Sequence, residues 1–132
     1  MIIMKFIKII SAYNAAKHLL TMKLEKYFSY GVYKVVKRFQ SDYEFYAQRE
    51  RELVCKYGQC DENGNPIIND ENKFTFKDAE AAKRYALEHA ELDNMEIELD
   101  GYVRPRVPWP DNVELQYILA LEDFIEFVAP EE

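Results

Sequence analysis

Residues 29–57, SYGVYKVVKRFQSDYEFYAQRERELVCKY, decide the fold because they contain no proline and a single early glycine, Gly31. Apolar residues recur in this stretch at alternating steps of four and three, which is the spacing of one face of a helix. This seam consists of Val32, Val36, Phe39, Tyr43, Tyr46, Leu53 and Tyr57, with Glu50 as its one interruption. The stretch therefore predicts one long helix whose apolar face has coiled-coil-like spacing.

The predicted helix is long for the size of the chain. At 1.5 Å of rise per residue it extends roughly 43 Å, whereas a small domain is about 30 Å wide. We expect the shorter helices of the chain to cover part of the seam and the cover to thin at Glu50. A binding surface on this helix is then expected toward its C-terminal end, around Tyr46, Glu50, Tyr57 and Gly58.

The composition is that of an ordinary globular protein with an excess of aromatic residues. The chain has 132 residues, of which 48% are hydrophobic, 31% charged and 14% aromatic. This length predicts a single domain over residues 1–132 that needs neither a metal nor a disulfide for its core. Residues 59–76 are predicted to be a hairpin excursion from that domain.

The segments before the long helix predict a strand and a short helix. Ile2 to Ile10 is rich in isoleucine and is typical of a strand, although it also fits the start of a buried helix. Ser11 is a good N-cap for a helix that runs to about Met22. Gly31 then marks a possible bend at the start of the long helix.

The long helix is expected to end in a turn-rich hairpin. Gly58 fits a left-handed C-cap residue. Asn63-Gly64 is the strongest turn signal in the polar run 61–66, and a four-residue loop at 69–72 separates Ile67-Ile68 from residues 73–76. These signals predict a small β-hairpin.

A third helix and a late strand follow the predicted hairpin. Thr75 and Asp78 are spaced to cap a helix from about Phe76 to Leu92. Met95 to Leu99 alternates apolar and acidic residues, as does a strand with one wet face. Its natural partner is the N-terminal strand, which would bring its acidic side chains near Lys5 and Lys8.

The last part of the chain predicts a rigid connector and a final helix. Residues 101–110 contain three prolines around Trp109, and each proline removes a backbone donor. Asp111 and Glu114 are spaced as a second cap. The final helix would present one broad apolar face: Leu115, Ile118, Leu119, Phe124, Ile125 and Val128. The predicted fold class is α+β and mostly helical: about four helices, one of them long, with a small β-hairpin and a short two-stranded pairing of the N-terminal and late strands.

Charge is divided unevenly along the chain. Residues 1–60 carry eleven Lys or Arg and five Asp or Glu, for +6, while residues 61–132 carry six and nineteen, for −13, which together give the net charge of −7. The acidic half either docks on the basic half or presents a negative field to a basic partner such as the nucleic-acid channel of a nuclease. Direct nucleic-acid binding is not expected, because Lys34, Lys37 and Arg38 are the only compact basic cluster.

The polar residues that resemble metal or redox sites do not complete one. Cys55 and Cys60 would need two further ligands to hold zinc, and the two histidines, His18 and His89, have no supporting motif; a redox pair and two free thiols are the alternatives. Asp61, Asn63 and Asn65 alternate as in a calcium loop, but the twelfth position lacks the required glutamate. We expect neither metal nor cofactor.

No catalytic constellation is recognisable in the sequence. The four glycines form no phosphate-binding loop, and no serine or cysteine stands in a nucleophile elbow. The prediction is therefore a non-enzymatic protein.

Candidate protein-binding residues come from the seam, the connector and the acidic half. A tryptophan on a proline-stiffened loop loses little entropy on binding, so Trp109 is either an interface anchor or a plug beneath the loop. Tyr46, Glu50 and Tyr57 represent the seam. The acidic candidates are Glu96, Glu98, Glu122 and Glu126.

The order of elements resembles that of a family of small uncharacterised phage and prophage proteins. The resemblance rests on Lys56-Tyr57-Gly58, which ends a charged helix and leads into the polar run Asp61-Glu62-Asn63-Gly64-Asn65-Pro66, and it covers roughly residues 11–127. That family has a short helix, a long charged helix, a polar hairpin, a late strand and a C-terminal helix. It has no assigned catalytic residues, and it implies a phage or prophage origin and the cytoplasm of a bacterial host.

Two functional hypotheses follow. The first is a non-enzymatic protein that binds a host or phage protein, most specifically an inhibitor of a bacterial defence nuclease of the CRISPR type. The second is a phage assembly or structural component that self-associates through the seam of the long helix. The opening residues contain Lys5 and Lys8 and make a poor signal peptide, so we expect no membrane segment.

Overall fold

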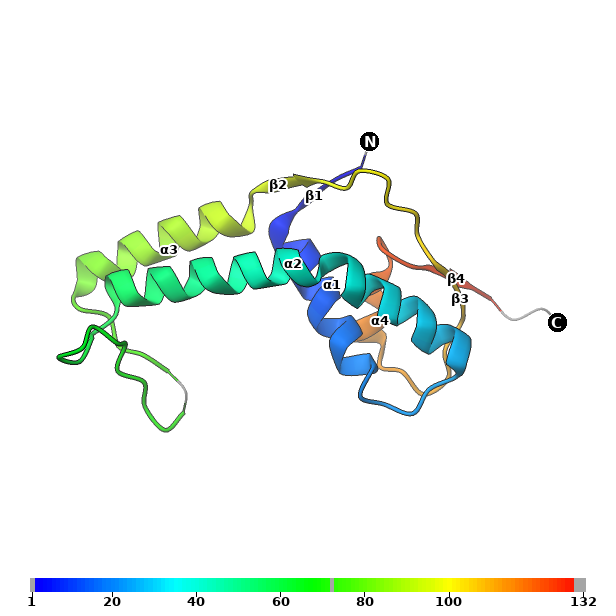
Figure 1. Ribbon diagram of the computed structural model, residues 1–132, viewed down its shortest axis with the longest axis horizontal. Coiled ribbons are helices and arrows are strands. Elements are labelled where there is room, and N and C mark those ends of the chain that lie inside the picture. Colours follow the sequence, from blue (N-terminus) through cyan, green and yellow to red (C-terminus); the bar gives the residue numbers. More distant parts are fainter. Residues whose placement is uncertain (1, 72, 130–132) are drawn as a thin grey trace. The chain divides into compact units, whose positions relative to one another are not determined.

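The computed structural model describes residues 2–71 and 73–129, and these residues form four helices and four short strands (Figure 1). In chain order the elements are β1 (Ile3–Lys5), α1 (Phe6–Leu19), α2 (Lys26–Tyr57), α3 (Ala79–Asp93), β2 (Glu96–Glu98), β3 (Arg106–Pro108), α4 (Leu115–Leu121) and β4 (Glu126–Val128). The predicted fold class, mostly helical with one long helix, is confirmed.

The chain divides into two compact units. Unit 1 consists of residues 1–43 and 96–132, and unit 2 consists of residues 44–95. The long helix α2 contributes its first part to unit 1 and its second part to unit 2. That the whole chain forms one domain stays a prediction, and the two units are described separately below.

The predicted pairing of the N-terminal and late strands is present in unit 1. Strands β1 and β2 are antiparallel, with Met4 opposite Ile97 and Lys5 opposite Glu96. The N-terminal strand is much shorter than the predicted Ile2 to Ile10, because α1 already begins at Phe6. Ser11 consequently lies inside α1, and its predicted role as an N-cap is wrong.

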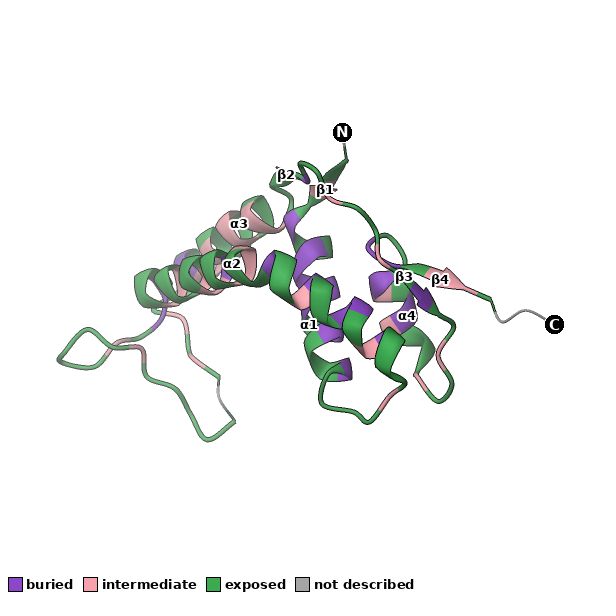
Figure 2. Cartoon of the chain, turned by 45° about the vertical axis from the view of Figure 1, so that its right-hand side comes forward, coloured by how far each residue is buried: buried purple, intermediate pink, exposed green. Residues whose placement is uncertain are grey.

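The early start of α1 follows from the spacing of its buried side chains. Phe6, Ile9 and Tyr13 are buried at steps of three and four, which is the helical alternative that the isoleucine-rich run left open. Figure 2 shows this buried side of α1 in purple. The core of unit 1 joins it to the first part of α2 and to α4, through residues that include Leu19, Phe28, Val32, Val35, Phe39, Leu121, Phe124 and Ile125.

Gly31 permits close packing and does not interrupt α2. It lies inside the helix, buried against β3. A Cβ added at this position would lie 2.1 Å from Cγ1 of Val107, well inside van der Waals contact. A side chain is therefore excluded here by the approach of the strand to the helix.

The C-terminal part of unit 1 differs from the single helix predicted for it. Helix α4 ends at Leu121, and β4 pairs in parallel with β3, so that Glu126 lies opposite Arg106. The guanidinium of Arg104 donates to the carbonyls of Glu122 and Ile125, at 2.7 and 3.0 Å. These bonds satisfy carbonyls that a continuing helix would have used, and they lie where the chain turns into β4.

The connector and the start of α4 also differ from expectation. Residues 106–108 of the proline-rich connector form β3, because Pro105 and Pro108 leave the donors of Arg106 and Val107 in place. Glu114 is the N-cap residue of α4, but its carboxylate accepts no backbone N–H of the helix, so the predicted cap from Asp111 and Glu114 is wrong.

Unit 2 is built from the second part of α2, a looped segment and α3. The predicted pair Thr75 and Asp78 is borne out only in part: Asp78 is the N-cap of α3, its carboxylate accepts the backbone N–H of Ala81 at 2.7 Å, and the helix begins at Ala79 and not at Phe76. The looped segment 58–76 contains three antiparallel bridges: Gly58 with Phe76, Cys60 with Pro66, and Ile68 with Phe74. Of the glycines that the structure describes, Gly64 and Gly101 have a positive φ and Gly58 does not. The left-handed cap predicted at Gly58 is therefore wrong.

Glycine is needed at position 58 because a side chain would not fit there, and not because the backbone is left-handed. A Cβ at Gly58 would lie 2.6 Å from the carbonyl oxygen of Val54 and 3.0 Å from the ring of Phe74. Among residues 2–71 and 73–129, no helix has the length and apolarity needed to cross a membrane.

Candidate functional site

The seam residues predicted to bind a partner lie inside unit 2. Tyr46 is 5% and Tyr57 is 7% exposed, and Glu50 is half-buried. Helix α3 supplies the side chains that contact them, and Figure 1 shows it running beside the second part of α2. Burial removes Tyr46 and Tyr57 from the candidate binding surface, since a partner cannot reach them in this arrangement.

His89 of α3 is the centre of a polar cluster in unit 2. Its Nε2 lies 2.8 Å from Oε2 of Glu50, and its Nδ1 lies 3.2 Å from Oδ2 of Asp93. The hydroxyl of Tyr46 donates to Oδ1 of the same Asp93. An imidazolium ring donates from both nitrogens and therefore satisfies both carboxylates at once, whereas a neutral ring donates to one.

The cluster also changes the acidity of two tyrosines. Burial, followed by the hydrogen bond to Asp93, raises the pKa of Tyr46 well above its ordinary value. Burial and the charges of Glu50 and Asp93 raise the pKa of Tyr85, whose ring lies 5.5 Å from that of His89. Both phenols remain protonated at neutral pH, so neither is an activated base or nucleophile. The cluster therefore acts chemically as a link between α2 and α3.

A shallow groove of about 400 Å³ lies on another side of unit 2. Lys56 and Glu88 form an ion pair of 3.2 Å across it, and the Lys56 ammonium lies 5.1 Å from the centre of the Tyr57 ring. The neighbouring Tyr57 hydroxyl and the Lys56 ammonium hold the pKa of Glu88 below its usual range. Ion pairs with Arg49 and Lys56 thus compensate Glu52 and Glu88, while Glu91 in the same lining has no cation among the described residues to balance it.

The loop and cysteine candidates take part in local turns. The carboxylate of Asp61 accepts the backbone N–H groups of Asn63 and Asn65 at 2.9 and 3.0 Å, as in an Asx-turn. The Cys60 thiol contacts the carbonyl of Cys55 at 3.5 Å, and both cysteines are free. Within the described ranges, no three His, Cys, Asp or Glu side chains are grouped to hold a metal ion.

Trp109 in unit 1 combines exposure with a fixed backbone. Trp109 is 48% exposed, and its ring contacts the ring of Phe127 edge-on, with the two centroids 5.7 Å apart. Its backbone N–H donates to the carbonyl of Val128 at 2.9 Å. A groove of about 500 Å³ lies beside the ring, lined in part by Met22, Leu24, Phe28, Pro108 and Pro110. Trp109 is therefore held against β4 on one side and open to an apolar groove on the other.

The acidic candidates of unit 1 are exposed, and they lie at two places. Glu96 and Glu98 flank the half-buried Ile97 on β2. Glu126 on β4 forms an ion pair of 3.4 Å with Arg106, and Glu122 follows α4. Because β3 and β4 pair side by side, the structure brings Glu126 and Trp109 to the same small sheet, a proximity that their separation in the sequence did not indicate.

Two functional features were missed by the sequence analysis. The polar cluster around His89 had a usable signal in the sequence. Tyr85 and Asp93 stand four residues before and after His89 on α3, and Glu50, which His89 contacts, is the one polar residue in the seam. The second is a row of exposed tyrosines and lysines on the outer side of α2. Its signal was the recurrence of Tyr27, Tyr30, Lys34 and Lys37 at steps of three and four.

Comparisons of the chain with protein-family models, with curated proteins and with solved structures gave no match.

Proposed function

We propose that this chain is a non-enzymatic binding protein of phage or prophage origin, and that the surface around Trp109 engages a basic protein partner in the cytoplasm of a bacterial host. The observation that carries this proposal is the half-exposed Trp109 ring beside an apolar groove, on a backbone fixed to β4. Rigid, partly exposed aromatic residues are typical anchors of protein interfaces.

Charge supports a basic partner. Residues 96–129 contain eight Asp or Glu and two Arg, which gives a charge of −6. Trp109 lies within this segment, and Glu126 is exposed on the strand that holds its backbone. Net negative charge in the segment that carries an aromatic anchor fits a positively charged partner and accelerates its approach.

The most specific form of the proposal is an inhibitor of a bacterial defence nuclease of the CRISPR type. Such enzymes bind nucleic acid in a positively charged channel, and an acidic protein seated there would exclude the substrate. The chain would need no cofactor and no reaction of its own for this role.

The test mixes the purified chain with assembled CRISPR-type nuclease complexes and measures co-elution and DNA cleavage. We expect Trp109→Ala to weaken binding by about 30-fold, as expected for an anchor worth about 2 kcal/mol. Glu126→Gln should slow association more than it speeds dissociation. The matched control is Glu62→Gln, an exposed carboxylate in the looped segment of unit 2.

Absence of both co-elution and inhibition across the nucleases tested removes the specific form. Binding that survives Trp109→Ala unchanged removes the proposed surface. The alternative, an assembly component that self-associates through the seam, has lost its main support because Tyr46 and Tyr57 are covered by their own chain. A concentration-dependent increase in mass by light scattering would restore it.

A further inference from the structure

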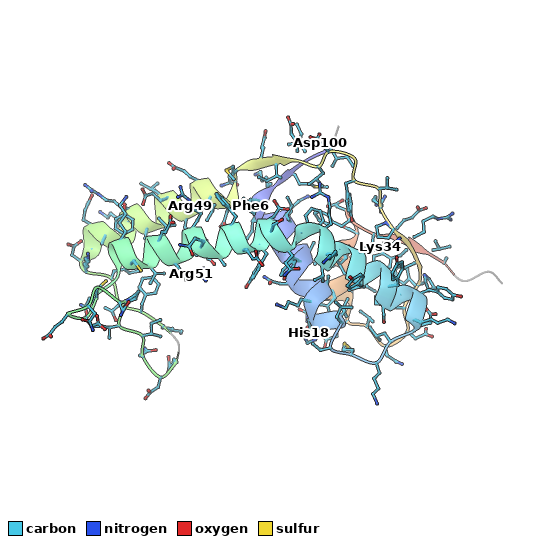
Figure 3. All side chains as sticks on the ribbon, viewed as in Figure 1. Phe6, His18, Lys34, Arg49, Arg51 and Asp100 are labelled. Atoms are coloured by element: carbon cyan, nitrogen blue, oxygen red, sulfur yellow. The ribbon has the colours of Figure 1, made fainter. Side chains whose placement is uncertain are left out.

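The outer side of α2 in unit 1 exposes three tyrosines and three lysines on one face. We name this set the tyrosine–lysine face: Lys26, Tyr27, Tyr30, Tyr33, Lys34 and Lys37. These positions fall on the side of the helix opposite the buried Phe28, Val32, Val35 and Phe39. Figure 3 labels Lys34 on this helix.

The tyrosines of this face contribute little to the core. Tyr27 is 66%, Tyr30 58% and Tyr33 47% exposed. The rings of Tyr30 and Tyr33 are stacked with an interplanar angle of 24° and centroids 6.2 Å apart. Three large aromatic rings held in water on a helix whose other face already fills the core need an explanation other than folding.

Lysine ammonium groups lie beside these rings. The Nζ of Lys26 is 5.1 Å from the centre of the Tyr27 ring, and that of Lys34 is 4.8 Å from the centre of the Tyr30 ring. None of the ion pairs formed by the described residues involves Lys26, Lys34 or Lys37. Lys26 interacts with the neighbouring carboxylate of Glu25, so the charge available to an anion that approaches the rings is that of Lys34 and Lys37.

The face is locally positive although the chain is negative overall. No Asp or Glu occurs between Glu25 and Asp42. The carboxylate of Glu25 accepts the backbone N–H of Phe28 at 2.9 Å and so caps the start of α2. At physiological ionic strength charges are screened over about 8 Å, so the field over the face is set by its own lysines and not by the net charge of −7.

From this juxtaposition of exposed rings and unpaired ammonium groups we infer that the tyrosine–lysine face binds single-stranded nucleic acid, with bases stacked on Tyr30 and Tyr33 and phosphates at Lys34 and Lys37. An acidic peptide would use the lysines but has no planar groups for the rings. A duplex would use the phosphate contacts but keeps its bases stacked on one another. The combination of both groups favours an unpaired strand.

Nucleic-acid binding was not expected from the sequence because only the number of clustered basic residues was taken into account. Lys34, Lys37 and Arg38 are few, but α2 adds three stacking platforms to them within about 17 Å of helix, from Lys26 to Lys37. A site of this length contacts only a few nucleotides, so binding is expected to be weak and strongly dependent on salt.

The experiment measures fluorescence anisotropy of a short labelled oligothymidylate and oligouridylate against the full chain over a series of salt concentrations. Phosphate contacts at Lys34 and Lys37 predict a slope of about −1.4 for log K against log salt, and Lys34→Gln with Lys37→Gln should reduce it to nearly zero. Tyr30→Ala with Tyr33→Ala should weaken binding at least about fivefold and leave the slope unchanged. The two probes separate DNA from RNA as the natural ligand.

Matched controls keep the inference falsifiable. Lys73→Gln with Lys77→Gln removes two exposed charges of unit 2, and Trp109→Ala removes an exposed ring elsewhere in unit 1; both should leave binding unchanged. Circular dichroism confirms that each variant is folded. Trp109→Ala also separates this inference from the proposed function, since that variant is expected to lose the protein partner only.

The inference is overturned by no binding at low salt, by equal losses in the control variants, by tyrosine variants that bind as well as the original chain, or by equal affinity for a polyglutamate peptide. The last two would indicate an acidic protein segment as the ligand. Tighter binding of a duplex of the same length would also overturn it, since the rings would then have no role.

Discussion

The contact between Gly31 and β3 makes a quantitative prediction about the stability of unit 1. Alanine is favoured over glycine inside a helix by about 1 kcal/mol, so Gly31→Ala would stabilise α2 if space allowed. The added methyl would instead lie 2.1 Å from Cγ1 of Val107, which is itself 1% exposed. Overpacking of this kind costs about 1–3 kcal/mol, and after the gain in helix propensity we expect a net loss of up to about 2 kcal/mol in the free energy of unfolding.

A second substitution tests whether the clash is the cause. Val107→Ala alone removes two buried methyl groups and should cost about 2 kcal/mol. Combined with Gly31→Ala, it removes the carbon that the new methyl would strike and leaves room for it. The double variant should therefore be more stable than the sum of the two single effects by at least about 1 kcal/mol.

The assay is urea denaturation followed by circular dichroism, with Ser41→Ala as the control. Ser41 is exposed on the same helix, so its replacement reports helix propensity without a steric term and should stabilise by a few tenths of a kcal/mol. Two results would refute the reasoning: a Gly31→Ala variant more stable than the original chain, or single effects that add within about 0.5 kcal/mol.

Three further predictions concern single side chains. Asp78→Ala removes the cap of α3 and should cost about 1 kcal/mol in urea denaturation, whereas Asp78→Asn should restore most of it. His89→Ala should cost about 1–3 kcal/mol because Glu50 and Asp93 lose their shared donor; a loss below about 0.5 kcal/mol would contradict the linking role. Burial raises the pKa of Tyr102 to about 12, so the unfolded chain ionises this phenol first and stability should fall as pH rises above about 10; a Tyr102→Phe variant that falls equally would refute this cause.

Sequence patterns predicted a helix or strand most accurately where residues close together in the chain determine it. The long helix followed from periodicity alone, and the spacing of Thr75 and Asp78 located the start of α3 to within three residues. The strand at Met95 to Leu99 was recognisable because its alternation leaves one wet face. None of these features depends on residues far away in the chain.

The errors arose where a distant contact decided the outcome. Phe124 and Ile125 have helical spacing with Leu121, and only the donors of Arg104 and the pairing with Arg106 turn the following residues into β4. Gly31 was predicted as a bend because its neighbour Val107 is 76 positions away in sequence. A parallel strand pair gives no local signal comparable to a hairpin turn.

The same contrast between local patterns and distant contacts applies to the candidate binding residues. Trp109 was selected because a tryptophan on a proline-stiffened loop stands out in the sequence, and its partial exposure is compatible with the anchor alternative, which stays a prediction. Tyr46 and Tyr57 were assigned to a partner because the sequence does not show that α3 returns along α2. Aromatic residues at helical spacing can serve either role, and only the position of the next helix decides between them.

The two faces of α2 in unit 1 show why burial and function must be considered together. One face is filled by Phe28, Val32 and Phe39, which are almost completely buried, so the helix is secured without its tyrosines. The opposite face contributes none of these almost completely buried side chains, and glutamate or glutamine at those positions would also be compatible with a stable helix. Tyr30, Tyr33 and the lysines at those positions, with no acidic residue among them, are therefore the features that the proposed binding of single-stranded nucleic acid would explain.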